Sequence, residues 1–250
     1  MELIRNCLQP FRKVTLADLD KVKLMNRTDL KFCLHVNQLP AILEAIQSDY
    51  SLLEIKNEII FKYDNTYFDT TDDQMFLCHH NGRSNRFKIR VRNYVESNLN
   101  FLEVKLKNNK GRTIKERVVK QEFRPEFTNN EIDFLTHATP FTGLQLLPKI
   151  GSFFKRFTMV NNDFTERVTV DICPGFKNSD KEITLNNLVI IEIKRDKSND
   201  KSLITKTLRE YKIRRQGFSK YCIGRSLLEE DIKKNNFKPL LLKISKDYLN

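Results

Sequence analysis

Residues 84–95 read SNRFKIRVRNYV, and cationic and apolar side chains alternate along them. Side chains alternate between the two faces of a β-strand, so the cations form a row on one face and the apolar residues form the other. Neighbours in such a row lie roughly 7 Å apart, where like charges repel unless salt or an anion intervenes. The stretch therefore predicts a strand with an anion-binding face. The cationic row is Arg86, Lys88, Arg90 and Arg92.

Two further alternating segments follow, at residues 99–107 (LNFLEVKLK) and 112–119 (RTIKERVV). Short polar turns at 96–98 and 108–111 separate the three segments, which predicts an antiparallel meander. In the segment 99–107, Glu103, Lys105 and Lys107 share one face, and the other face is apolar.

The same pattern recurs elsewhere in the chain. Strands are predicted at residues 27–35 with Lys31 on the polar face, at 166–173 with Arg167, and at 188–195 with Glu192 and Lys194. Residues 58–70 and 153–160 also have strand composition. Helices are expected at 15–22, 36–50, 71–80 with Thr71 as N-cap, 200–214 and 220–233, with short helices in 129–150 and an extended or helical tail after 235.

Two arrangements of these strands remain open. An antiparallel sheet commonly buries its apolar face and exposes its ionic face to water. The alternative is a closed barrel of inverted polarity, with helices on its apolar outside and an anion held inside. The isolated carboxylates Glu103 and Glu192 would then hold Mg²⁺ or Mn²⁺, although salt bridges to neighbouring lysines explain them equally well.

Composition narrows the function classes. Lys and Arg total 44 against 32 Asp and Glu, a net charge of +12, which indicates an anionic partner. No G-x-x-x-x-G-K loop is present, so phosphates would be held by side chains. The 250 residues fit one domain. The five cysteines form no C-x-x-C pair, and no signal or membrane-spanning stretch is visible, which favours a cytoplasmic protein.

Several stretches together resemble the VTC domain, the catalytic domain of vacuolar transporter chaperone polyphosphate polymerases, and through it the CYTH-like triphosphate tunnel metalloenzymes. They occur in family order over nearly the whole chain, and we expect a domain core at about 24–234 and a tail at 235–250. The matching stretches are RTDLKF (27–32), YFDT (67–70), HHNGRSNRFKIRVRNY (79–94), FLEVKLKNNKGRTIKER (101–117), RVTVD (167–171), VIIEIK (189–194) and GFSKYCIG (217–224).

The resemblance implies an α+β fold: an eight-stranded antiparallel β-tunnel with an ionic interior and helices on the outside. It also implies transfer of the γ-phosphate of ATP onto polyphosphate with a divalent metal, Mn²⁺ or Mg²⁺. The phosphate ligands carried over by matching positions are Lys31, Arg90, Arg92, Lys105, Arg167 and Lys220, and the metal carboxylate is Glu192. Strand alternation adds Lys88, Lys107 and Lys194 as cations of the site and Glu103 as a second acid.

The resemblance leaves some points open. Related tunnel enzymes usually carry E-x-E-x-K in the first strand, where this chain has Arg27 and Asp29, which weakens a metal role there. The same cage could hydrolyse triphosphate or short polyphosphate, or only bind polyphosphate or RNA. The chain has no Trp, and Phe87 falls on the apolar face, which argues against nucleic acid. Export of a polymer would require a membrane-protein partner.

Overall fold

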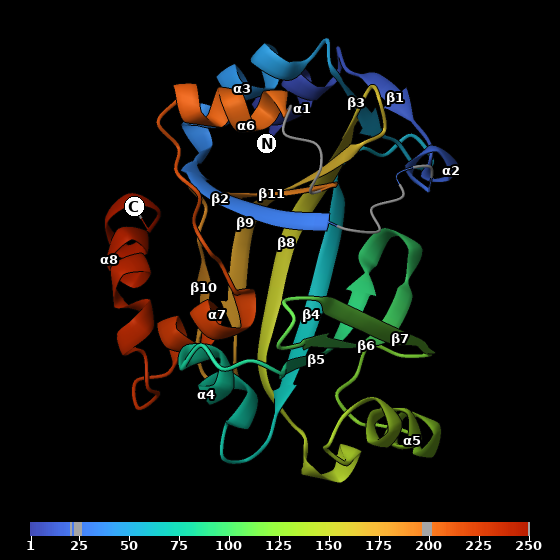
Figure 1. Ribbon diagram of the computed structural model, residues 1–250, viewed down its shortest axis with the longest axis vertical. Helices are drawn as coiled ribbons and strands as arrows, with labels where there is room; N and C mark the ends of the chain where they lie inside the picture. The colour runs from blue at the N-terminus through green and yellow to red at the C-terminus, as the bar shows by residue number, and fades with distance from the viewer. Residues whose placement is uncertain (21, 23–26, 197–201, 250) are drawn as a thin grey trace.

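Eleven strands form one sheet in this computed structural model, which describes residues 1–250 except 21, 23–26, 197–201 and 250 (Figure 1). The main path of the sheet runs β2-β11-β9-β8-β4-β5-β6-β7, and each step is antiparallel. The path strands are β2 (Arg27–His35), β4 (Phe61–Asp69), β5 (Arg86–Tyr94), β6 (Leu99–Lys107), β7 (Thr113–Lys120), β8 (Leu147–Asn161), β9 (Glu166–Lys177) and β11 (Leu188–Asp196).

Three short strands lie off this path. β1 (Arg12–Val14) pairs in parallel with β3 (Tyr50–Leu53), which in turn pairs with β8, and β10 (Glu182–Thr184) extends β9. The sequence pattern did not predict them, because three or four residues are too few to show a period of two. The predicted meander is confirmed as β5, β6 and β7.

The closed eight-stranded barrel expected from the resemblance is wrong in two respects. The sheet has eleven strands, and its end strands β2 and β7 do not pair with each other. The free edge of β2 is occupied instead by the chain after α6 (Leu203–Glu210): Phe32 forms a bridge with Arg215, and the Gln216 amide donates to the Lys31 carbonyl at 2.8 Å. An antiparallel α+β sheet with helices is the architecture observed.

Helices cover the apolar face of the sheet. α1 (Glu2–Leu8), α3 (Leu39–Ile46) and α6 gather at one end of the molecule (Figure 1) and bury Leu8, Ile42 and Leu208 against alternate residues of β2, β11, β9 and β8. α5 (Asn129–Ala138) packs Leu135 on the apolar face of β5 and β6. The apolar faces of the strands therefore lie outward, under these helices, and the ionic faces lie on the opposite side of the sheet.

The other side of the sheet is partly filled by α7 (Lys220–Leu228) and α8 (Lys238–Asp247), which lie with α4 (Gln74–His80) along one flank of the molecule (Figure 1). Tyr221, Cys222 and Ile223 of α7 pack with Ile190 and Cys33 in a separate apolar cluster. The first residues of α7 are thereby held beside the ionic strand faces. This position gives the helix N-terminus access to anything bound there.

The start of α4 differs from the prediction. Its N-cap residue is Asp73, in the left-handed region with φ 60°, and no side chain of that residue caps the helix. Asp69 takes over the capping: its carboxylate accepts the amides of Met75 at 2.9 Å and Phe76 at 2.8 Å, and Thr70 Oγ1 accepts the Gln74 amide at 3.1 Å. The predicted cap Thr71 is wrong because it lies in a turn, closed by the Asp73 amide donating to the Thr70 carbonyl at 3.1 Å, and the helix begins only at Gln74.

Candidate functional site

Cations from β2, β5, β6, β7, β8, β9 and β11 share the face of the sheet that α1, α3, α5 and α6 leave uncovered, here called the ionic face. Cross-strand pairing aligns them: Lys88 lies opposite Lys105, Arg90 opposite Glu103, and Lys31 opposite Glu192. The ionic face comprises Lys31, Lys88, Arg90, Arg92, Lys105, Lys107, Lys115, Arg117, Arg156, Arg167 and Lys194, with Glu103, Asp171 and Glu192.

The sheet curls so that its two arms face each other across this surface. Lys105 on β6 and Lys194 on β11 are separated in the sheet by β9, β8, β4 and β5. Even so, their charges interact. The pKa of Lys105 lies well below its usual value, mainly because of Arg90 and burial, and the charge of Lys194 lowers it further. Glu192 likewise feels the charge of Lys105. The ionic face is therefore a concave, shared interior and not a flat surface.

Asp171 is the centre of the first cluster and is 3% exposed. Arg156 binds both of its oxygens, with Nε 2.5 Å from Oδ1 and Nη2 2.9 Å from Oδ2, and Lys220 Nζ contacts Oδ2. Burial would raise the pKa of Asp171, but the two cations lower it below its usual value. Burial lowers the pKa of Lys220 despite this pairing. Asp171 thus fixes two cations, from β8 and from α7, at one point.

Glu103 is the centre of the second cluster, and its side chain is fully buried. Arg90 donates from Nε at 2.8 Å and from Nη2 at 2.6 Å to Oε2, while Lys115 Nζ pairs with Oε1. Arg90 Nη1 also reaches the Tyr67 hydroxyl at 3.4 Å. Burial would raise the pKa of Glu103, but Arg90, Arg92 and Lys115 lower it. Both carboxylate oxygens are therefore engaged by cations.

Three cations of the ionic face, Arg92, Lys88 and Lys105, have no carboxylate within ion-pair distance in the described part of the chain. Arg92 is 7% exposed, and its Nε donates to Asn65 Oδ1 at 2.8 Å. Lys88 Nζ donates to Ser219 Oγ at 3.1 Å. Lys105 is half-buried, and burial together with neighbouring arginines lowers the pKa of Lys105 and of Arg92. Such a surplus of poorly solvated positive charge is what an anion-binding interior requires.

Glu192 is less tightly held than the other two acids. Lys31 Nζ lies 3.7 Å from Oε2 and Lys194 Nζ 3.6 Å from Oε1, both longer than a hydrogen bond. Its side chain is 19% exposed. Burial would raise the pKa of Glu192, yet Lys31, Lys194, Arg156 and Lys105 hold it well below its usual value. The carboxylate is ionised and accessible among the cations.

The donor set at Glu192 fits a hard divalent metal only if a ligand supplies further oxygens. Within the described ranges, no group of three or more His, Cys, Asp or Glu is placed to hold a metal. Mg²⁺-type ions are often bound by one or two carboxylates together with substrate phosphates, so a single available carboxylate is compatible with such a site. Glu103 fits poorly, because Arg90 and Lys115 occupy its oxygens.

The structure places the predicted strand residues on the ionic face, and Lys220 reaches it from α7. Lys31, Arg90, Arg92 and Lys105 lie around the two clusters, with Lys88 and Lys194 beside them. Arg167 and Lys107 lie toward the periphery. Arg167 Nη2 donates to the Leu19 carbonyl of α2 (Leu16–Leu19) at 2.6 Å, and Lys107 is exposed. The roles of all these residues as ligands stay predictions.

Sequence reasoning missed Arg156 and Lys115, and it left Asp171 without a role. The signal for Arg156 was obscured by the run of aromatics in GSFFKRF and by the bulge between Phe153 and Lys155, which shifts the register against β9. Asp171 did stand on a polar face by alternation. Its partner Lys220 lies 49 residues away, so only the fold joins them.

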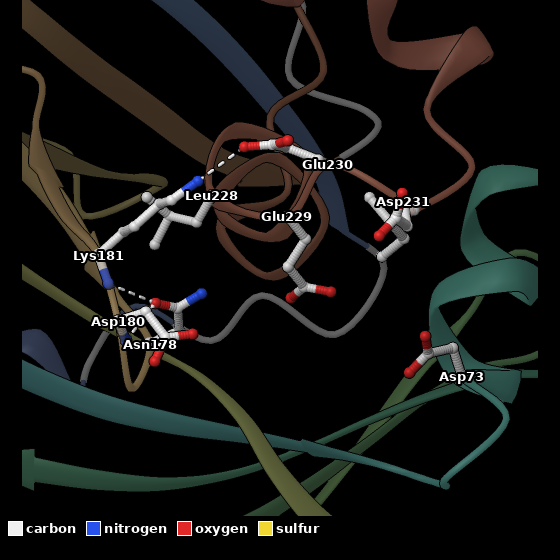
Figure 2. Close-up of a pocket in the computed structure, with 9 residues that line it drawn as sticks. Asp73, Asn178, Asp180, Lys181, Leu228, Glu229, Glu230 and Asp231 are labelled. Carbon is white, nitrogen blue, oxygen red and sulfur yellow. Dashed lines mark hydrogen bonds and ion pairs between the residues drawn. The ribbon is translucent and has the colours of Figure 1, made fainter.

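A pocket of about 450 Å³ lies apart from the ionic face and has acidic walls (Figure 2). Lys181 projects from one wall and pairs with Glu230 at 2.8 Å, while Asp73 and Glu229 are both bound by Arg225. The lining includes Asp73, Asn178, Asp180, Lys181, Leu228, Glu229, Glu230, Asp231 and Ile232. The negative charge of these walls disfavours the binding of phosphates in this pocket.

None of the helices in the described ranges combines the length and apolar character that a membrane span requires. All five cysteines are free thiols, and burial raises the pKa of Cys222 beside the site, which keeps this thiol protonated.

Comparison with known proteins shows that the family model of the VTC domain matches residues 26–229. No curated protein matches the sequence. Among solved structures, a candidate adenylyl cyclase from Hippeastrum, described as having a dominant triphosphatase activity, is 15% identical with a TM-score of 0.52, covering 83% of this chain and 98% of that one. A candidate adenylate cyclase from Bacillus halodurans is 14% identical with a TM-score of 0.47, covering 78% and 96% respectively.

Proposed function

This chain belongs to the VTC domain family, and on that premise we propose that it transfers the γ-phosphate of ATP onto a polyphosphate chain held along the ionic face. The observation that carries the proposal is the surplus of cations without carboxylate partners, above all Lys105 and Arg92, in an interior that two arms of the sheet enclose. A polyanion would neutralise this charge and relieve the repulsion.

The proposed roles follow from the contacts. Lys31, Lys105 and Arg92 bind phosphate oxygens directly, since no carboxylate in the described part of the chain holds them by a hydrogen bond. Asp171 and Glu103 act as internal anchors that fix Arg156 and Lys220, and Arg90 and Lys115, in position before substrate arrives. Phosphoryl transfer depends mainly on positioning and charge stabilisation, so preorganised cations of this kind lower its barrier.

The other family-matched cations extend the same surface. We assign Arg90, Arg167 and Lys220 to phosphate binding, and Lys88, Lys107 and Lys194 to further contacts along a longer chain. Glu192 would hold Mn²⁺ or Mg²⁺ together with the phosphates, whereas Glu103 is better suited to anchoring cations. A divalent metal held by Glu192 would supply positive charge that offsets part of the charge on the phosphates.

Hydrolysis of triphosphate is the second candidate function. The Hippeastrum protein described as a triphosphatase shares the fold, and a cage that orients a phosphoryl group for a phosphate acceptor can present it equally to water. The two functions differ in the acceptor alone. In both reactions the ionic face would bind the phosphoryl donor.

Product analysis separates these functions. The purified chain is incubated with ATP labelled at the γ-phosphate and with Mn²⁺, and products are resolved by gel electrophoresis and thin-layer chromatography. Long-chain polymer is the expected product. Orthophosphate alone would indicate a triphosphatase, and triphosphate binding without any turnover would indicate a non-catalytic binding module.

A further inference from the structure

An aromatic belt crosses the ionic face beneath the cations. The rings of Phe154 on β8, Tyr63 on β4, Tyr94 on β5 and Phe101 on β6 follow one another with centroid separations of 5.2, 5.0 and 5.9 Å. Phe154 and Tyr63 are stacked almost parallel, with 5° between their planes. Alternation at Phe87 predicts that strand aromatics lie on the apolar face, and this prediction is wrong for these four residues.

Tyr63 occupies a special place in the belt because two arginines share its ring. The guanidinium carbons of Arg92 and Arg156 each lie 5.2 Å from the centroid of the Tyr63 ring. Arg156 belongs to the cluster around Asp171, and Arg92 follows Arg90 of the Glu103 cluster on β5. The two guanidinium groups repel each other: the charge of Arg156 contributes, after burial and Arg90, to the lowered pKa of Arg92.

We propose that Tyr63 is a positioning residue of the phosphate site, which holds Arg92 and Arg156 together by a shared cation–π contact and so joins the two cation clusters. An aromatic face attracts a guanidinium group through its quadrupole, most strongly where water is scarce. The planar guanidinium also stacks well while its edges stay free for hydrogen bonds, so the contact leaves the N–H groups available.

The two guanidinium groups use their planes for the Tyr63 ring and their N–H groups for hydrogen bonds. Arg156 uses its Nε and Nη2 for Asp171, and Arg92 uses its Nε for Asn65. Tyr63 contributes its ring and not its hydroxyl, because the hydroxyl makes no hydrogen bond among the described residues. Replacing Tyr63 by Phe should therefore be tolerated, and replacing it by Leu should not.

The inference rests on the proposed function for its consequence, namely tighter binding of a polyphosphate anion. Wild type, Tyr63→Phe, Tyr63→Leu and the control Phe87→Leu are compared by calorimetric titration with inorganic triphosphate. Phe87 is the matched control because its ring lies on the opposite face of the sheet, against Phe141. Tyr63→Leu should weaken triphosphate binding by roughly tenfold, since two cation–π contacts are lost. Tyr63→Phe and Phe87→Leu should stay near wild type.

A second measurement is independent of any ligand. In NMR spectra of the free protein, the δ-protons of Arg92 and Arg156 should be shifted upfield by the Tyr63 ring in wild type and Tyr63→Phe. The shift should be clearly smaller in Tyr63→Leu, where only the contacts of Arg156 with Phe154 at 5.0 Å and of Arg92 with Tyr94 at 5.9 Å remain. Shifts of wild-type size in Tyr63→Leu would overturn the inference, as would unchanged triphosphate affinity in that variant. If the wild type itself fails to bind triphosphate, the phosphate role of both the face and Tyr63 falls, while the NMR comparison still decides whether Tyr63 holds the two arginines.

Discussion

Arg156 holds Asp171 through two parallel contacts, and on the same carboxylate Lys220 is held from a helix that begins 49 residues further along the chain. Through this shared carboxylate, Arg156 and Lys220 therefore join the strand β8 to the helix α7 across the concave face. A carboxylate of this kind organises cations and has no free oxygen for a metal. It also makes the geometry of the site depend on the docking of α7, whose apolar side packs against Ile190 and Cys33.

We predict that Asp171→Asn destabilises the protein and that triphosphate partly restores it. Removing one partner of a buried ion pair costs about 3–5 kcal/mol, because the remaining charges stay buried without compensation. Here Arg156 and Lys220 would both be left, and a bound phosphate could replace the lost charge. Urea unfolding with and without triphosphate measures both effects, and the stabilisation by triphosphate should be larger in the variant than in wild type.

The control for this variant is Glu230→Gln, which removes the exposed partner of Lys181 at the acidic pocket and should leave the unfolding midpoint unchanged. Equal stability of Asp171→Asn and wild type would show that Asp171 does not neutralise the cluster. Equal stabilisation of both by triphosphate would place the phosphate elsewhere.

Lys105 provides a prediction about pH. Arg90 and burial lower the pKa of Lys105 in the folded protein from 10.5, so over the interval between the two pKa values the unfolded chain binds more protons. This group therefore adds stability as the pH rises through its lowered pKa. A bound polyanion favours the charged amine, so binding should take up protons and weaken as the pH rises through that pKa.

Calorimetric titration of triphosphate in buffers of different ionisation enthalpy measures this proton uptake. The uptake should be smaller in Lys105→Met than in wild type. Lys107→Met removes a cation from the same face of β6, but an exposed one, and should leave the pH dependence of binding intact. The same uptake in Lys105→Met and wild type would assign it to another group.

Local alternation carried most of the correct predictions. β2, β5, β6 and β11 alternate between polar and apolar residues over most of their length, and their predicted ranges differ from the observed ones by two residues at most. The pattern also placed Lys105 and Glu192 on the polar face, because that face is fixed by the covalent geometry of a strand. Both the strand ranges and the faces of these side chains depend on the order of residues within a single strand, which the local sequence contains.

The incorrect or missing predictions involve contacts between distant segments. Whether β2 pairs with β7 or with the chain around Arg215 is decided by the route of the chain after α6, which periodicity does not show. The cap of α4 depends on Asp69 reaching over the helix from the end of β4. The bulge in β8 that hides Arg156 is likewise set by its pairing with β9. Non-local pairing is the part that local pattern does not encode.

Replacing Glu192 or Glu103 by Gln should have different effects, because the surroundings of the two carboxylates differ. Glu192→Gln is expected to abolish metal-dependent turnover while triphosphate binding is retained, since its contacts to Lys31 and Lys194 are loose and it is the available carboxylate for a metal. Glu103→Gln is expected to lower the free energy of unfolding by about 3–5 kcal/mol, since Arg90 and Lys115 lose a buried partner.

The measurements for this pair are turnover as a function of Mn²⁺ concentration, triphosphate binding by calorimetry, and urea unfolding. The pKa of Glu103 is lowered on folding, so its stabilisation is present above the ordinary value of 4.5 and is lost as the pH falls below it. The acid-induced loss of stability should therefore be smaller in Glu103→Gln than in wild type. Wild-type turnover in Glu192→Gln would remove Glu192 from the metal site, and a changed Mn²⁺ dependence with unchanged stability in Glu103→Gln would transfer that role to Glu103.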